Sequence, residues 1–195
     1  MRPKKSRFEL GFTLLETSVV LLLAGVVIAI ATPKITNAMR EFRANIALRQ
    51  MVDTFNRARM QAVSENKRSA MIVDTANNRA GMAVLKYDAP SSSWIVDQIY
   101  YGPLPQGVTF QRPSAAPAGV TTLGVTSFPA NGSSTTVFRQ DFNSRGFPVV
   151  ASGSDVVSVF LGNGMSYRCV TMTSSGGLRT YRSDTSAGNW VDTRY

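Results

Sequence analysis

The 195-residue sequence contains no histidine and a single cysteine, Cys169. Without histidine it lacks the commonest general base and metal ligand, and one thiol cannot complete a zinc site or a Cys-His nucleophile. A disulfide within the chain needs two cysteines, and a Ser-His-Asp triad needs a histidine. Glycine-rich phosphate loops and calcium-loop spacings are also missing. We therefore predict a protein that is not an enzyme, with no catalytic residues, no metal site and no cofactor.

Acidic residues are scarce, since 12 Asp and Glu stand against 21 Lys and Arg to give a formal net charge of +9. Most of this excess lies near the N-terminus, with +3 in residues 1–11 and +5 in residues 34–68. Residues 69–133 are balanced, and residues 134–195 carry +2. The distribution indicates a basic globular face for nucleic acid only weakly.

Charge is almost absent from residues 12–31, twenty mostly apolar residues that suffice to cross about 30 Å of hydrocarbon as a helix. The basic leader MRPKKSR precedes them, which by the positive-inside rule places the N-terminus in the cytoplasm. Glu16 is the one charged residue in this run. Inserting a carboxylate near the centre of a membrane helix costs about 2.5 kcal/mol or more, so Glu16 needs a compensating interaction. The alternative interpretation is a secretory signal cleaved after the small-x-small triplet AIA at 29–31.

Apolar periodicity continues beyond this run, which argues against a cleaved signal. Residues at helical spacing predict one apolar stripe on an amphipathic helix that reaches about Asn66, formed by Ile35, Met39, Phe42, Ile46, Val52, Phe55 and Val63. Pro33 is expected to kink the helix without ending it. We therefore predict one helix over residues 12–66, with a transmembrane part at 12–33 and an amphipathic part at 34–67.

Beyond the helix the pattern changes to period two with many β-branched residues, which predicts strands at 69–75, 80–88, 93–102, 135–142, 154–163, 166–174 and 177–183. Residues 103–134 are expected to form a long surface excursion with at most one short strand in its Pro-, Ala-, Gly- and Ser-rich part. Cys169 is expected to be buried in its strand as a small hydrophobe. The predicted fold class is α+β, a long N-terminal helix packed on an antiparallel sheet of about six to eight strands within a head at 68–195.

The motif GFTLLE at residues 11–16, after a short basic leader, resembles the type III signal of type IV prepilins and pseudopilins. The resemblance implies that a membrane aspartyl protease, the prepilin peptidase, cuts between Gly11 and Phe12 and methylates the new N-terminal Phe12. Residues 1–11 are then a leader peptide, and Pro33 lies where these proteins often have a proline. The implied location is the inner membrane, crossed once, with the head in the periplasm before the chain joins a filament.

Glu16 becomes the fifth residue of the processed chain. The resemblance implies that its carboxylate pairs with the N-terminal amine of a neighbouring pilin subunit in the filament. Burying an ion pair costs less than burying one charge, so such pairing favours correctly registered neighbours. In the free subunit, surrounded by inner-membrane lipid, the side chain has the alternative of reaching towards the headgroups.

Three further stretches resemble the GspH/FimT branch of the family: ARMQAVSENKRSAMIVD, DFNSRGFPV and YRCVTMTSSGGLRTYR. This branch contains minor pseudopilins of type II secretion systems and minor pilins of type IV pili. The implied function is that of a structural filament subunit, scarce and located at the tip. The sequence does not distinguish between the two machines.

Some FimT-like minor pilins bind DNA for uptake in natural transformation through basic C-terminal residues. The resemblance therefore implies an alternative function of this kind, with Arg179 and Arg182 as the candidate DNA contacts and Tyr181 between them. Leu178 departs from that motif, which has an arginine at this position. The interpretation we favour is a final strand whose arginines face solvent. A third interpretation is a secreted β-rich binding domain released after Ala31.

Overall fold

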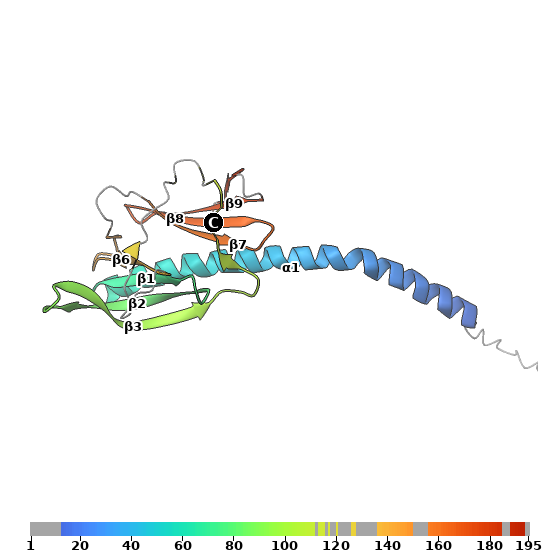
Figure 1. The fold of residues 1–195 in the computed structure, drawn as a ribbon, viewed down its shortest axis with the longest axis horizontal. Helices are drawn as coiled ribbons and strands as arrows, with labels where there is room; N and C mark the ends of the chain where they lie inside the picture. The colour runs from blue at the N-terminus through green and yellow to red at the C-terminus, as the bar shows by residue number, and fades with distance from the viewer. Residues whose placement is uncertain are drawn as a thin grey trace, which may run out of the picture. The chain divides into compact units, whose positions relative to one another are not determined.

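The computed structural model describes residues 13–111, 113–115, 117, 120, 126–127, 136–149, 156–184 and 188–193. One helix, α1 (Leu14–Ser64), is followed by strands β1 to β10 (Figure 1). The chain forms two compact units, Met1–Met39 and Arg40–Tyr195. The predicted class, α+β with a long N-terminal helix and antiparallel strands, is confirmed.

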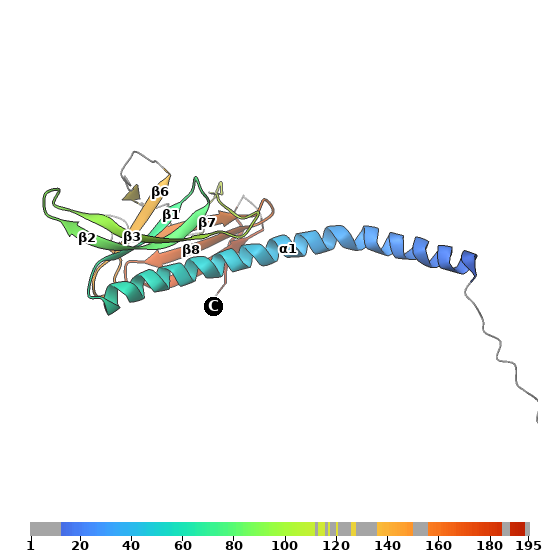
Figure 2. The same cartoon turned by 90° about the horizontal axis from the view of Figure 1, so that it is seen from below.

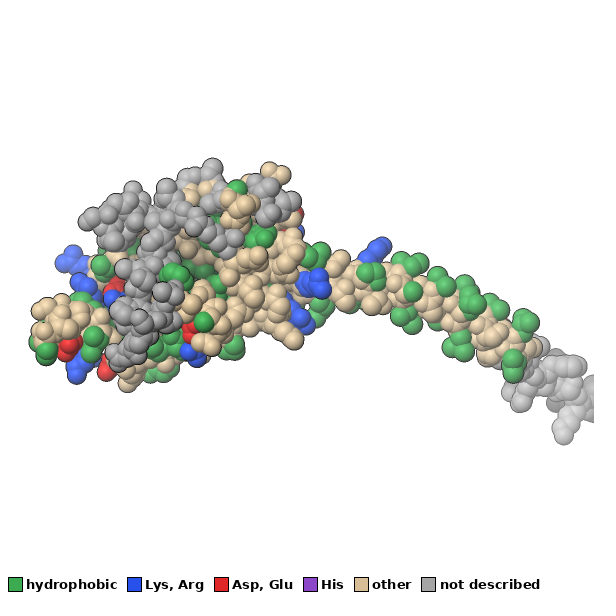
Figure 3. Space-filling model, in the orientation of Figure 1, with side chains coloured by type: hydrophobic (Ala, Val, Ile, Leu, Met, Phe, Trp, Pro, Cys, Tyr) green, Lys and Arg blue, Asp and Glu red, His purple; other side chains and the backbone are tan. Residues whose placement is uncertain are grey.

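The first unit consists of the apolar part of α1. No residue from Thr13 to Met39 is buried, and Leu14 and Leu21 are 87% and 72% exposed. Hydrophobic side chains follow one another along this part of the helix (Figure 3). By length and composition α1 is able to cross a membrane. A helix segment that is apolar on all sides is suited to lipid or to protein partners rather than to water.

The predicted single helix over 12–66 is confirmed with slightly narrower bounds, Leu14–Ser64. The helix continues through Pro33, as expected, although proline cannot donate the usual backbone hydrogen bond. Two threonine hydroxyls next to the proline donate to backbone carbonyls one turn earlier, Thr32 to Ile28 at 2.7 Å and Thr36 to Pro33 at 2.9 Å.

Among the described residues of the head, ten strands pair in antiparallel fashion and form two sheets rather than the one that we expected. One sheet has the order β3-β2-β1-β6-β5 and the other the order β10-β9-β8-β7-β4. Their bounds are β1 (Ser69–Asp74), β2 (Arg79–Asp88), β3 (Ser93–Pro103), β4 (Thr109–Phe110), β5 (Thr126–Ser127), β6 (Val137–Phe142), β7 (Val156–Gly162), β8 (Tyr167–Thr173), β9 (Leu178–Ser183) and β10 (Val191–Asp192). Period-two patterns located the seven longer strands, but pairing depends on contacts distant in sequence and could not be derived from them.

Within the head, both sheets pack on the C-terminal half of α1, which lies beside the strands in both views (Figures 1 and 2). The helix buries one face, made of Ala44, Ala47, Leu48, Met51, Phe55, Ala58 and Ala62. Four of these seven residues are alanines, which let the strand side chains approach the helix backbone closely. The main core joins this face to residues of β1, β2, β4, β6, β7 and β8.

The apolar stripe predicted for α1 is not the side of the helix that packs on the sheets. Of its residues only Phe55 is buried, whereas Phe42 and Ile46 are 60% and 41% exposed. At about 100° per residue, Phe42 and Ile46 lie nearly opposite the buried alanines. The helix therefore has two apolar faces, and helical spacing alone does not say which of them packs on the sheets.

Smaller clusters occupy other parts of the sheets. Ala70, Ile72 and Ala83 are buried with partly buried residues of β3, so β1 is buried along its whole length. Cys169 is fully buried beside Phe160, as expected, and burial raises the pKa of its thiol.

Matched phenylalanine substitutions test the assignment of the two helix faces. Phe55→Ala should lower the free energy of unfolding by about 3–5 kcal/mol, because it leaves a cavity in the main core. Phe42→Ala, on the exposed side, should change it by less than about 0.5 kcal/mol. Urea unfolding of the full chain in mild detergent, followed by near-UV circular dichroism, measures both. Equal losses would contradict the assignment.

Candidate functional site

The start of α1 contains a local signal that the sequence analysis missed. Thr13 precedes the helix, and the backbone N–H of Glu16 donates to the Thr13 hydroxyl at 3.2 Å. Thr-x-x-Glu is the capping-box pattern, and an acid in the first turn also interacts favourably with the helix dipole. The Thr13 hydroxyl therefore caps the helix start, and the roles of the Glu16 carboxylate in capping and in assembly stay predictions. The predicted processing residues Gly11 and Phe12 lie outside the described residues.

A second polar site lies in the head, where two arginines stand side by side. Arg168 of β8 and Arg182 of β9 are directly opposite each other in the antiparallel register. Like charges at opposite positions of neighbouring strands destabilise a sheet. The Arg168 side chain is also 1% exposed, so its charge needs a partner inside the protein.

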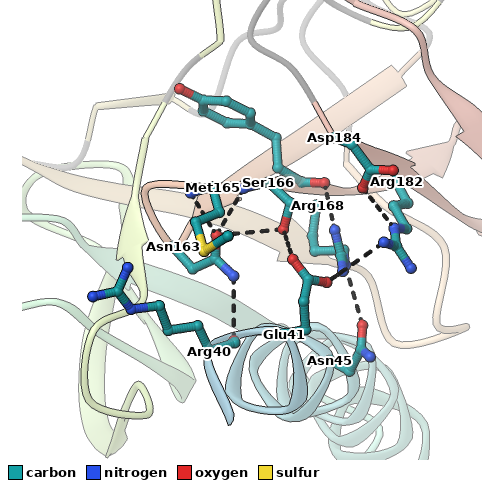
Figure 4. A network of polar contacts seen from close by, with 10 residues as sticks. Arg40, Glu41, Asn45, Asn163, Met165, Ser166, Arg168, Arg182 and Asp184 are labelled. Atoms are coloured by element: carbon teal, nitrogen blue, oxygen red, sulfur yellow. Dashed lines mark hydrogen bonds and ion pairs between the residues drawn. The ribbon is translucent and has the colours of Figure 1, made fainter. Parts of the chain in front are cut away.

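Glu41 of α1 supplies the opposing charge (Figure 4). Its Oε2 lies 2.5 Å from Nη2 of Arg168 and 3.7 Å from Nη2 of Arg182. Its Oε1 accepts a hydrogen bond from the hydroxyl of Ser166 at 2.6 Å. One carboxylate therefore pairs with both guanidinium groups and connects the helix to the sheet. We call Glu41, Asn45, Asn163, Ser166, Arg168 and Arg182 the Glu41 cluster.

The other two nitrogens of the Arg168 guanidinium also have hydrogen-bond acceptors. Its Nε donates to Asn45 Oδ1 at 3.1 Å, and its Nη1 donates to the Tyr167 carbonyl at 3.0 Å. From the turn between β7 and β8, Asn163 donates to the carbonyl of Arg40 at 3.2 Å. Buried charges are tolerated when they are paired and hydrogen-bonded, and this guanidinium has an ion-pair partner and an acceptor at each of its three nitrogens.

The cluster shifts the titration of Glu41. Desolvation acts to raise the pKa of Glu41, but the Ser166 hydroxyl and the charges of Arg168 and Arg182 outweigh it and hold this pKa below its ordinary value. The carboxylate is therefore ionised at neutral pH and acts as a structural counter-ion. Among the described residues, no group of three or more acidic or cysteine side chains is placed to hold a metal ion.

The structure does not bring the two candidate DNA contacts together. Arg179 and Arg182 are three positions apart on β9, so their side chains project from opposite faces of the strand. Arg182 lies on the face towards α1 and pairs with Glu41 and, at 2.9 Å, with Asp184. Arg179 is exposed on the other face, on the same side as Tyr181, which packs beside Cys169. No single cationic surface therefore contains both arginines.

Comparison with family profiles, with characterised proteins and with solved structures gives no match for this chain. The architecture is compatible with that of pilins, since one long apolar N-terminal helix packs on antiparallel strands. The resemblance to pilins therefore rests on the residues of the motif, and this architecture is compatible with it.

Removing the counter-ion should destabilise the head. Glu41→Gln leaves the buried charge of Arg168 without a counter-ion, opposite Arg182, and should lower the free energy of unfolding by about 3 kcal/mol. Asp184→Asn removes only the exposed partner of Arg182 and should cost less than about 0.5 kcal/mol. Urea unfolding of both variants measures the difference. A Glu41→Gln protein as stable as the Asp184→Asn protein would show that the cluster does not hold the helix.

The stability that Glu41 contributes to the folded protein should depend on pH. Because the pKa of Glu41 is lower in the folded state, its contribution to stability is complete above its ordinary value of 4.5 and is lost as pH falls through the folded-state pKa. The gap in stability between wild type and Glu41→Gln should therefore narrow only below about pH 4.5. Other acids, including Asp74 and Asp141, titrate in both proteins and cancel in the comparison. A gap that is constant down to strong acid would contradict the ion pairing.

DNA binding stays a prediction from the sequence, and a mobility shift at low salt tests it. If Arg179 and Arg182 contact one DNA molecule together, changing either to alanine should weaken binding and reduce its salt dependence. No shift, or a shift that both Arg179→Ala and Arg182→Ala leave unchanged, would reject these contacts.

Proposed function

We propose that this protein is a minor pilin or pseudopilin, a non-enzymatic structural subunit of a type IV pilus or a type II secretion pseudopilus. One observation carries the proposal: the apolar residues that directly follow the motif GFTLLE are helical, and none of them is buried by the chain itself. Prepilin peptidase cuts at Gly11–Phe12, and the remaining helix anchors the subunit in the inner membrane with its head in the periplasm.

Lipid and neighbouring subunits are proposed to cover the same apolar surface of α1, lipid before assembly and the neighbouring subunits after it. In the free subunit, lipid covers side chains such as Leu14, Leu21 and Ile28, which are 64–87% exposed in the chain alone. In the filament, the apolar helices of neighbouring subunits replace the lipid. Phe42 and Ile46, exposed on the side of α1 that faces away from the sheets, extend the surface available to such neighbours into the head.

Glu16 has two proposed roles that can be separated. The capping box requires a side chain that accepts a hydrogen bond, and glutamine serves this purpose as well as glutamate. Pairing with the N-terminal amine of a neighbouring subunit requires the charge. A neutral glutamine therefore keeps the first role and loses the second.

The first test is the mature N-terminus. Mass spectrometry after co-expression with a prepilin peptidase should find a chain that begins with N-methylated Phe12, and Gly11→Lys should abolish this processing. A mature chain that begins at Thr32 would instead show a secreted domain released by signal peptidase.

The second step of the test is assembly. With the other filament subunits present, Glu16→Gln and Glu16→Ala should both be cleaved normally, and both should be lost from the sheared filament fraction at least about tenfold. Normal incorporation of Glu16→Gln would show that capping, and not charge, is the function of this residue.

A further inference from the structure

The uncovered part of α1 is about as long as a membrane is thick. Residues 14–39 of the helix belong to the first compact unit and, at 1.5 Å per residue, measure about 39 Å. A bilayer is about 40–45 Å thick when its headgroup regions are included. If this segment crosses the membrane, the second unit, which begins at Arg40, therefore begins where the headgroups end.

Two arginines lie in the first turn of α1 that belongs to the head, Arg40 and Arg43. Basic side chains gather at the end of the head that α1 enters (Figure 3), and Arg40 points away from Glu41 (Figure 4). Arg40 is exposed and Arg43 is partly exposed. Among the described residues, neither guanidinium group has an ion-pair partner. Both charges are therefore available to an anion outside the chain.

The acids that the structure places nearby are already paired. Glu41 pairs with Arg168 and Arg182, and Asp184 pairs with Arg182. With the two arginines of the first turn, four guanidinium groups stand against two carboxylates. These six groups together carry an excess of two positive charges at this end of the head.

Two exposed apolar side chains accompany the cations. Phe42 is 60% exposed, and Met165, in the turn between β7 and β8, is 40% exposed. This turn adjoins the start of the head, because Asn163 donates to the Arg40 carbonyl at 3.2 Å. Cationic side chains next to apolar ones are typical of protein surfaces that lie at a membrane interface.

We propose that Arg40 and Arg43 bind the phosphate groups of anionic phospholipids, in the leaflet on the side of the head, before the subunit joins a filament. Guanidinium groups bind phosphate through strong, charge-assisted hydrogen bonds. Basic residues next to a membrane helix are attracted to anionic lipid within about one Debye length of the surface, about 8 Å at physiological ionic strength. The inference rests on the proposed membrane anchoring and adds the class of lipid that the head recognises.

DNA is another polyanion that arginines bind, and the surroundings of these two favour lipid. Arg40 directly follows the helix segment that lipid is proposed to cover, so headgroups are the anions nearest to it before assembly. Phe42 and Met165 suit a membrane surface, whereas the phosphate backbone of a duplex offers apolar side chains no partner.

Lipid retention by the full chain in mild detergent tests this inference. Native mass spectrometry counts the lipids that stay bound after incubation with dioleoylphosphatidylglycerol or, separately, with zwitterionic dioleoylphosphatidylcholine. Arg40→Gln/Arg43→Gln should retain about one to two fewer phosphatidylglycerol molecules per chain than wild type, and the same number of phosphatidylcholine molecules. Lipid bound at the basic leader is common to both proteins and cancels in the comparison.

The matched control is Arg57→Gln/Arg145→Gln, which removes two positive charges at other exposed positions of the head. It should retain as much phosphatidylglycerol as wild type, because it leaves the first turn of the head unchanged. Near-UV circular dichroism should be the same for all three proteins, since the substituted side chains lie at the surface.

The inference is overturned if Arg40→Gln/Arg43→Gln retains as much phosphatidylglycerol as wild type, if the control loses as much, or if phosphatidylcholine is lost equally. A DNA complex in the low-salt mobility shift that this variant alone abolishes would assign the two arginines to DNA instead. A chain that is processed at Gly11 but shows no such loss of lipid contradicts only this inference. A chain that is not processed contradicts the proposed function, whatever lipid it retains.

Discussion

The apolar part of α1 is not covered by its own chain, so it needs lipid or another protein to cover it. This constraint limits the environments in which the protein can be stable. From Thr13 to Met39 no side chain of α1 is buried, whereas from Ala44 onwards the helix buries one face under its own sheets. A water-soluble protein would have to expose the whole apolar segment to water. Lipid and the helices of other subunits are the two environments that remove this cost, and a filament subunit meets them in succession.

The Glu41 cluster lies close to the point where the helix begins to be covered by the sheets. Arg168 and Arg182 would repel each other on neighbouring strands, and Glu41 of the helix pairs with both, while Asp184 also pairs with Arg182. The ionic contact is specific in register, because a shift of α1 by one residue would move the carboxylate away from the buried guanidinium. Apolar packing of alanines, Leu48, Met51 and Phe55 then continues the attachment along the helix. The cluster thus specifies where the packing starts, and the core supplies most of its free energy.

The sequence predicted those elements whose signals are local. Helical spacing and period-two patterns located α1 and the longer strands to within a few residues, and the Thr-x-x-Glu pattern at Thr13 was available although it was not used. The core-facing side of α1 could not be predicted, because Phe42 and Ile46 form a second apolar face and small alanines carry little hydrophobic signal. The contact of Glu41 with Arg168 joins residues 127 positions apart, and the division into two sheets depends on similar long-range pairing. Neither has a signature in the local sequence.

The most direct test of the central claim, that the apolar part of α1 is a membrane anchor, is extraction of bacterial membranes at alkaline pH after expression of the full chain without prepilin peptidase. Alkaline carbonate releases peripheral and soluble proteins and leaves helices that cross the bilayer in the membrane pellet. The account predicts that the uncleaved chain stays in the pellet and is released only by detergent. Recovery of the chain in the carbonate supernatant, whether at full length or shortened to the domain after Ala31, would contradict it.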